Sequence, residues 1–290
     1  MIHNLSIEEQ TVVGVFLEGK QLRVGRIRNN QIQKSLYAEI DNFETEEVII
    51  AQLISAIEKV FTPEVVGIGI GVPSLVDVNK GIVYNPEHIP SWKEVHLGDI
   101  LARQFNVKIY VNNDANCFTV GEKYFGKGRK YSNMVGIISG IGMGMGLVID
   151  NKLYSGVNCG AGEFGAIPYR DHTYEFYCTL GYFELKYGMK PDKLFARARK
   201  EDKIALAILE QFGLDFGQVV KTILYTVDPE FIVIGGPISR FYPFIIPNIH
   251  KSLRKFPYPK TIEKLVIDVS DEPEIGVLGA AALYFDALKG

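Results

Sequence analysis

The sequence predicts a two-domain α/β protein with a ligand-binding cleft between the domains. Its 290 residues are more than one core comfortably accommodates, and 47% of them are hydrophobic, which is enough to fill two cores. Each half of the chain begins with strand-like runs and continues with alternating helices and strands. Two similar α/β halves that face each other form a cleft, and such clefts are common ligand sites.

The first half is expected to contain three strands followed by α/β alternation. Thr11–Phe16 and Gln21–Ile27 form a predicted hairpin around Gly19, and Ile32–Ile40 is the third strand. The later elements are a helix over Glu46–Phe61, a buried strand over Val65–Val72, a helix over His96–Phe105 and a strand over Val107–Val111.

The second half repeats this order. Met134–Ile138 is a predicted strand, the glycine-rich run Gly140–Gly146 follows, and Leu147–Ile149 resumes strand character. The later elements are a long amphipathic helix over 203–227, a strand over Phe231–Ile234, a helical stretch, a strand over Leu265–Val269 and a helix over Glu274–Ala287. We expect one domain over residues 1–115, completed by the C-terminal helix at about 276–290, and a larger one over 116–275.

Composition and charge exclude several classes of protein. The formal net charge of −3 provides no positive field that would attract nucleic acid. Cys117, Cys159 and Cys178 lack CxxC spacing, so we expect a reducing compartment rather than a disulfide framework. Glu8 and Glu9 stand where a signal peptide would be apolar, and no apolar run reaches transmembrane length. We therefore expect a cytoplasmic protein that binds neither membranes nor nucleic acid directly.

Polar residues follow the predicted strand that ends at Val111. Asn113, Asp114 and Asn116 lie where the carboxyl end of a strand opens toward a ligand in α/β folds. Asp114 is a candidate base that would accept a proton from a substrate hydroxyl, which Asn113 and Asn116 would orient. The alternative is that Asp114 or Asn116 caps the following helix.

Three glycines surround Glu163 within the run Gly160–Gly165. Such spacing suggests backbone packed tightly around a buried acid, and a buried carboxylate needs a partner. The vicinal hydroxyls of a sugar would supply one. The alternative is a loop glutamate in solvent.

Two glycine-rich turns are candidate nucleotide-binding segments. Gly140, Gly142 and Gly144 alternate in a way that lets backbone N–H groups approach a phosphate, although a twisted hairpin explains the same pattern. Gly235 and Gly236 follow a buried strand and would form either a flat wall for a nucleotide base or a simple strand-to-helix turn.

Together these segments resemble the ROK family of repressors, open reading frames and kinases over nearly the whole chain. The matching motifs, in chain order, are Gly71–Asp77 with Gly81, Trp92, Asn113–Asn116 with Gly121-Glu122, Lys152–Gly165 and Gly276–Ala281. The resemblance implies a glucokinase-like chain with the actin-like ATPase (ribonuclease H-like) fold, and a homodimer. It also implies that Asp114 is the catalytic base for a hexose hydroxyl, and that Asn113, Glu163 and Glu184 bind the sugar.

The nucleotide motifs depart from those of the family's kinases. Their D-x-G-G-T phosphate loop corresponds here to Phe16–Lys20, so Phe16 replaces the acid that helps to hold Mg²⁺. Loss of such a carboxylate costs several kcal/mol of transition-state stabilisation, or about 10²–10⁴ in rate. Glu18 replaces a glycine, Ile141 replaces a threonine in the second phosphate loop, and Pro237 replaces a glycine beside the adenosine.

The structural zinc of the family is not expected either. Its histidine position is Ala166, and its three cysteine positions are Glu175, Tyr177 and Tyr182. Cys178 is one residue out of register, and these residue types do not form a tetrahedral zinc site. Ala166 also removes a histidine that touches the sugar in the family's kinases.

Three functional hypotheses follow from this pattern. The first is a degenerate ROK protein that senses a hexose or amino sugar, without a certain cofactor and without the helix-turn-helix by which the family's repressors bind DNA. The second is an active kinase that uses ATP and Mg²⁺, with Asp114 as its base. The third is a structural or interaction module in which Asp114 only caps a helix. The sequence alone does not decide whether the protein is an enzyme.

Overall fold

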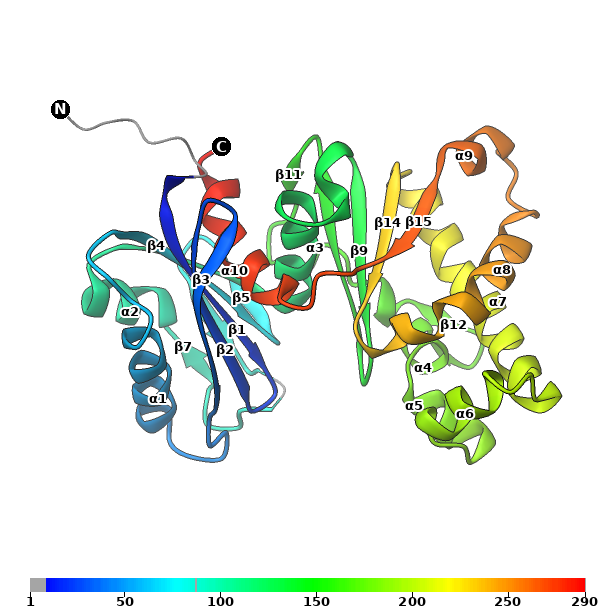
Figure 1. The fold of residues 1–290 in the computed structure, drawn as a ribbon, viewed down its shortest axis with the longest axis horizontal. Coiled ribbons are helices and arrows are strands. Elements are labelled where there is room, and N and C mark those ends of the chain that lie inside the picture. The colour runs from blue at the N-terminus through cyan, green and yellow to red at the C-terminus, as the bar shows by residue number, and fades with distance from the viewer. Residues whose placement is uncertain (1–8, 87, 290) are drawn as a thin grey trace. The chain divides into compact units, whose positions relative to one another are not determined.

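The computed structural model describes residues 9–86 and 88–289, and its contacts divide the chain into two compact units (Figure 1). The first unit comprises the chain up to Lys130, Gly146–Ala161 and the chain from Asp271. The second comprises Tyr131–Met145 and Gly162–Ser270. Residues 116–130, 146–161 and 271–275 therefore lie in the first unit, whereas the sequence analysis assigned them to the second domain.

The first unit is built on a five-stranded sheet of order β3-β2-β1-β4-β8. Its strands are β1 (Thr11–Glu18), β2 (Gln21–Arg28), β3 (Gln31–Glu39), β4 (Val65–Val72) and β8 (Lys108–Asn113). β1 pairs with β2 antiparallel and with β4 parallel, and β4 pairs with β8 parallel. The carboxyl ends of β1, β4 and β8 therefore meet at one edge of the sheet.

Helices cover both faces of this sheet. Successive side chains of a strand point to opposite faces, so apolar residues on both faces need a covering layer. Val13 and Val15 contribute to a core with α1 (Glu46–Glu58) and α2 (Leu97–Phe105). Val12 and Phe16 point to the other face, where α10 (Ile275–Ala287) packs beside α3 (Asp114–Tyr124). Gly69 of β4 permits this close packing, since a Cβ there would lie 1.8 Å from the carbonyl oxygen of Ala280. The unit also contains the 3₁₀ turn Lys127–Lys130.

A small antiparallel sheet in the first unit was not predicted from the sequence. It has the order β5-β6-β7 and consists of β5 (Leu75–Asp77), β6 (Ile82–Tyr84) and β7 (Glu94–Val95). Strands of two or three residues are too short to show a periodic pattern.

The second sheet has the order β11-β10-β9-β14-β15, which repeats the arrangement of the first. Its strands are β9 (Met134–Ser139), β10 (Met143–Ile149), β11 (Lys152–Leu153), β14 (Phe231–Gly235) and β15 (Val266–Val269). β14 pairs in parallel with both β9 and β15. The predicted similarity of the two halves is thus present in their strand orders.

The second unit is dominated by α7 (Lys203–Thr226) and α8 (Tyr242–Leu253), which pack against each other. Asp202 caps α7 by accepting hydrogen bonds from the backbone N–H groups of Ile204 and Ala205. The shorter elements are β12 (Pro168–Tyr169), β13 (His172–Thr173), α4 (Tyr174–Cys178), α5 (Gly181–Tyr187), α6 (Pro191–Ala198), α9 (Pro259–Lys264) and the 3₁₀ turns Phe164–Ala166 and Pro237–Phe241. Among the described residues, no helix combines the length and apolarity needed to cross a membrane.

Candidate functional site

The candidate base Asp114 is the first residue of α3, directly after the carboxyl end of β8. The side chain of Asn113 caps this helix, because its Oδ1 accepts hydrogen bonds from the backbone N–H groups of Ala115 (2.8 Å) and Asn116 (3.4 Å). The sequence analysis left open whether Asp114 or Asn116 caps this helix. In the structure the capping residue is Asn113. Asp114 is half-buried and accepts from the N–H of Ala115 at 2.9 Å. The positive end of the helix favours a negative charge there, which is the form that a base requires.

A buried polar network lies beneath this turn, and Asn112 is at its centre. Asn112 Oδ1 accepts from Asn116 Nδ2 at 2.9 Å and from the Cys159 thiol at 3.2 Å, while Asn112 Nδ2 donates to Ser155 Oγ at 3.2 Å. Asn116 is only 1% exposed, so its side chain supports the turn from below. Asn113 Nδ2 donates to the carbonyl oxygen of Ser74. The network thus fixes the backbone that presents Asp114.

The sequence analysis did not single out Asn112, Ser155, Cys159 or Ser74. The available signal was the unbroken run of polar residues from Asn112, which is unusual at the end of a buried parallel strand. Ser155, Cys159 and Ser74 come from segments distant from this run, and no local pattern in the sequence indicates their hydrogen bonds to it.

The segment that corresponds to the first phosphate loop is the end of β1 and its turn. Phe16 is 4% exposed, and its ring lies against the backbone of Gly71 and Gly276. Glu18 pairs with Arg23 at 3.4 Å, and Lys20 Nζ lies 2.9 Å from Glu39 Oε2. Position 16 therefore contributes to the apolar core, and both charged side chains of the turn are engaged with β2 and β3.

The second glycine-rich segment connects β9 and β10. The N–H of Met143 donates to Glu175 Oε2 at 2.9 Å, and the N–H of Gly140 donates to the carbonyl oxygen of Gly142 at 3.0 Å. The side chain of Ile141, at the tip, is 93% exposed. Two backbone donors are thus already satisfied, one of them by a carboxylate that would repel a phosphate. Gly144, the third predicted glycine, lies within β10.

Gly235 is the last residue of β14, and Gly236 leads into the 3₁₀ turn that begins at Pro237. Gly236 has a φ of 78°, and a Cβ there would lie 2.6 Å from the carbonyl oxygen of Ser139. The ring of Pro237 packs near Gly140, with its Cδ 3.0 Å from where a Cβ on Gly140 would lie. The segment forms the strand-to-helix turn that the sequence analysis gave as one alternative.

Glu163 and Glu184, the predicted sugar ligands of the second unit, both have exposed side chains. Glu163 precedes the 3₁₀ turn Phe164–Ala166 without capping it. Desolvation by the surrounding protein, and secondly the nearby carboxylate of Glu175, raise the pKa of Glu163. Glu163, which was predicted to be buried, is therefore exposed. Partial desolvation and the carboxylate of Glu175 nevertheless disfavour its charged form. Glu184 lies on α5.

The positions of the family's zinc ligands do not fit a metal here. The ring of Tyr177 packs on those of Tyr169 and Tyr182, with centroid distances of 5.4 Å and 5.3 Å. Glu175 accepts the N–H of Met143. Within residues 9–86 and 88–289, no group of three or more His, Cys, Asp or Glu side chains could hold a metal ion. Packed aromatic rings occupy the region instead.

These two repeated sheets define an actin-like α/β protein. The chain belongs to the ROK family, whose model matches residues 19–287. A glucokinase from Thermotoga maritima is 27% identical, and the match covers 96% of this chain and 98% of the glucokinase. A xylose repressor from Bacillus spizizenii is 29% identical over 67% of this chain, which spans 54% of the repressor.

A solved structure shows the same fold. The ROK hexokinase from Thermus thermophilus matches with a TM-score of 0.82 at 19% identity, over 97% of this chain and 100% of that chain. The predicted actin-like fold and the resemblance to the ROK family are confirmed. The relatives include both kinases and repressors, so family membership supports a function related to sugars without deciding between catalysis and sensing.

Proposed function

We propose that this protein binds a hexose or amino sugar through the Asn113–Asn116 turn and acts as a sugar sensor rather than as an ATP-dependent kinase. The observation that carries the proposal is the burial of Phe16 at the position where the family's kinases have an acid that supports Mg²⁺. An apolar ring there provides no oxygen ligand, and Mg²⁺ binds through oxygen.

The second phosphate loop supports the same proposal. Glu175 occupies the N–H of Met143, and a phosphate at this loop would approach that carboxylate. Two unit charges 4 Å apart repel by about 4 kcal/mol at an effective dielectric constant of 20. Both halves of the predicted nucleotide site are therefore altered in a way that disfavours a metal-bound triphosphate.

The turn that carries Asp114 retains what a sugar site needs. A half-buried carboxylate at a helix start accepts hydrogen bonds from sugar hydroxyls, and the Asn112 network holds that turn in place. The relatives named above are a glucokinase and a xylose repressor, which makes glucose and xylose the first sugars to test. Glu163 and Glu184 remain predicted sugar ligands. A cytoplasmic location and a homodimer also remain predictions.

Isothermal titration of the whole chain with a panel of hexoses, amino sugars and xylose tests sugar binding. We expect saturable binding of at least one sugar, and we expect Asp114→Asn to weaken it at least tenfold by removing a charged acceptor. Asp99→Asn is the matched control, since Asp99 is an exposed acid on α2 of the same unit. Equal affinities of Asp114→Asn and wild type would remove Asp114 from the site and leave it only a structural role.

The second candidate is an active ATP-dependent sugar kinase. The near-complete match to a glucokinase and the position of Asp114 at the end of β8 favour it. A coupled assay of ADP release over the same sugar panel decides between the two. Sugar-dependent turnover that Asp114→Asn abolishes would establish the kinase, whereas the proposed sensor gives no turnover.

A further inference from the structure

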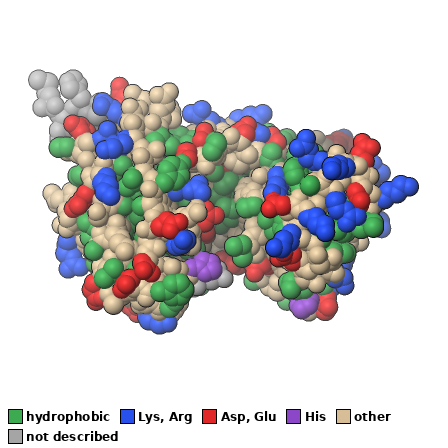
Figure 2. All heavy atoms as spheres, turned by 60° about the horizontal axis from the view of Figure 1, so that its bottom comes forward, with side chains coloured by type: hydrophobic (Ala, Val, Ile, Leu, Met, Phe, Trp, Pro, Cys, Tyr) green, Lys and Arg blue, Asp and Glu red, His purple; other side chains and the backbone are tan. Residues whose placement is uncertain are grey.

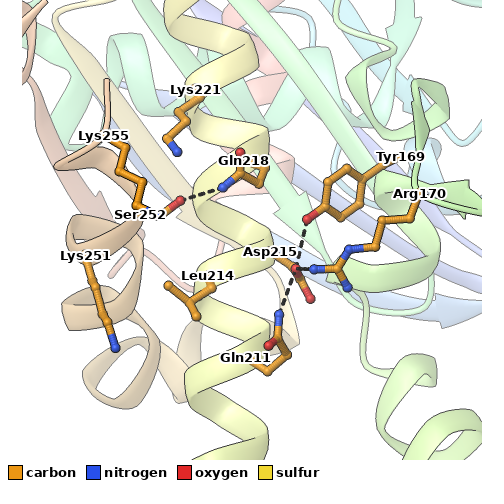
Figure 3. Close-up of a pocket in the computed structure, with 10 residues that line it drawn as sticks. All are labelled: Tyr169, Arg170, Gln211, Leu214, Asp215, Gln218, Lys221, Lys251, Ser252 and Lys255. Carbon is orange, nitrogen blue, oxygen red and sulfur yellow. Dashed lines mark hydrogen bonds and ion pairs between the residues drawn. The ribbon is translucent and has the colours of Figure 1, made fainter. Parts of the chain in front are cut away.

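A pocket of about 320 Å³ lies in the second unit, where α7 and α8 meet the segment that follows β12 (Figure 3). The two helices pack closely here. A Cβ added to Gly217 of α7 would lie only 2.4 Å from the Cβ of Ser252. The volume is at the lower end of the range for small-molecule sites. None of the predicted sugar or nucleotide residues lines it.

Basic side chains dominate the lining. Four of the ten lining residues are basic, namely Arg170, Lys221, Lys251 and Lys255, and the lining has one carboxylate, that of Asp215. Figure 2 shows that Lys and Arg side chains also gather on the surface that the second unit forms. The pocket therefore differs in charge from the protein as a whole, whose net charge is −3.

The carboxylate of Asp215 forms an ion pair with Arg170. Asp215 is 1% exposed, and its Oδ1 accepts from Arg170 Nη2 at 2.6 Å, Tyr169 O–H at 3.0 Å and Gln211 Nε2 at 3.1 Å. Figure 3 shows these three donors converging on Asp215 at one side of the pocket. Asp215 therefore neutralises Arg170 and does not compensate the charges of Lys221 and Lys255 on the opposite side of the pocket.

Lys221 and Lys255 form no ion pair with any described residue, whereas Lys251 pairs with Glu210 at 2.7 Å. Desolvation, and secondly the charge of Lys255, lower the pKa of Lys221. Two like charges beside a partly buried concavity destabilise the empty pocket, and a bound anion would relieve this repulsion.

Ser252 supplies a buried donor beside these lysines. Its side chain is 5% exposed, and its Oγ accepts from Gln218 Nε2 at 2.9 Å. That bond orients the hydroxyl, whose hydrogen has no acceptor among the described residues. A hydroxyl with a free hydrogen next to two unpaired ammonium groups is a donor set suited to phosphate oxygens.

We propose that this pocket binds a phosphoryl group, with Lys221 and Lys255 supplying the charge and Ser252 donating a hydrogen bond. Inorganic phosphate and a phosphorylated sugar carry the same recognised group, and the pocket volume accommodates either. The site is independent of the proposed sugar site, because the two share no residue.

Isothermal titration of the whole chain with inorganic phosphate and with glucose 6-phosphate, at matched ionic strength, tests the proposal. We expect saturable binding of at least one, and at least tenfold weaker binding in Lys221→Gln. Lys203→Gln is the matched control, since it removes the same charge from the exposed start of α7 outside the pocket. It should bind as wild type does. Tighter binding of glucose 6-phosphate than of phosphate would identify a phosphorylated sugar as the ligand.

Three results would overturn the proposal: no saturable binding of either probe, unchanged affinity in Lys221→Gln, or equal weakening in Lys221→Gln and Lys203→Gln. If Lys221→Gln folds poorly, Lys255→Gln is a second variant, because Lys255 is exposed. We expect it to weaken binding of the probes by the same factor. Titration of Lys221→Gln with the free sugar separates this site from the proposed sugar site, because that affinity should not change.

Discussion

The ring of Phe16 lies directly on the backbone of Gly276, so that a Cβ built on this glycine would stand 2.9 Å from Cδ1 of the ring. Phe16 belongs to β1 and Gly276 to the first turn of α10. The residue that departs from the kinase motif is thus an integral part of the contact between sheet and helix. Phe16, which replaces the acid of the kinase motif, packs in the apolar core. Position 16 therefore has a structural role in this protein.

Restoring an acid at position 16 should therefore destabilise the protein rather than create a metal site. Phe16→Asp removes a buried ring and buries an unpaired carboxylate, which should lower the free energy of unfolding by at least about 3 kcal/mol. Urea unfolding measures this loss. Phe43→Asp is the matched control, because Phe43 is 81% exposed and the change should be nearly neutral. A Phe16→Asp protein that is as stable as wild type and binds Mg²⁺ would refute the structural role.

Gly276→Ala should be destabilising by about 1–3 kcal/mol, because the new methyl group would overlap three atoms of the Phe16 ring. The smaller side chain of Phe16→Leu should reduce the cost of Gly276→Ala, so the two changes should be coupled in a double-mutant cycle. Gly181→Ala serves as the control, since a Cβ there meets nothing within 4 Å. Additive effects of Phe16→Leu and Gly276→Ala would show that the two residues do not constrain each other.

The pKa of Glu163 predicts a specific pH dependence of stability. The folded protein raises this pKa above its unfolded value, so the folded state binds the proton more tightly. Stability from this group is present below the unfolded pKa and is lost as pH rises through the folded pKa. Glu163→Gln should therefore reduce the decline of the urea midpoint between about pH 4 and pH 7. An unchanged decline would mean that Glu163 is not perturbed.

The Asn112 network can be tested by a single truncation. Asn112→Ala leaves Asn116 and Ser155 without their buried partner, which should cost about 1–3 kcal/mol of stability and weaken sugar binding by displacing the turn. Asn158→Ala is a nearby control, because Asn158 is exposed. Thermal unfolding and sugar titration of both variants give the two readouts. Equal behaviour of Asn112→Ala and Asn158→Ala would contradict the supporting role of Asn112.

Much of the fold could be predicted from the sequence, because its long elements have clear periods. The strand over Val65–Val72 is observed with the predicted bounds, and the helix predicted over 203–227 ends one residue earlier. The short strands β5–β7 and the helices α4–α6 were not predicted, because such brief segments carry little periodic signal.

The site was less predictable than the fold. Asn113 rather than Asp114 caps α3, and this choice depends on side-chain geometry that the pattern N-D-A-N does not determine. The pairing of Glu175 with Met143 joins positions 32 residues apart. Lys221 lies on α7 and Lys255 in the turn that follows α8, so only the packing of α7 on α8 brings their charges together.

A titration of the sugar-saturated chain with the Mg²⁺ complex of a non-hydrolysable ATP analogue tests the central claim most directly. With Phe16 in the core and Glu175 at the second phosphate loop, we expect no saturable heat at millimolar nucleotide. Saturable nucleotide binding that depends on Mg²⁺ would contradict the account and establish a working nucleotide site.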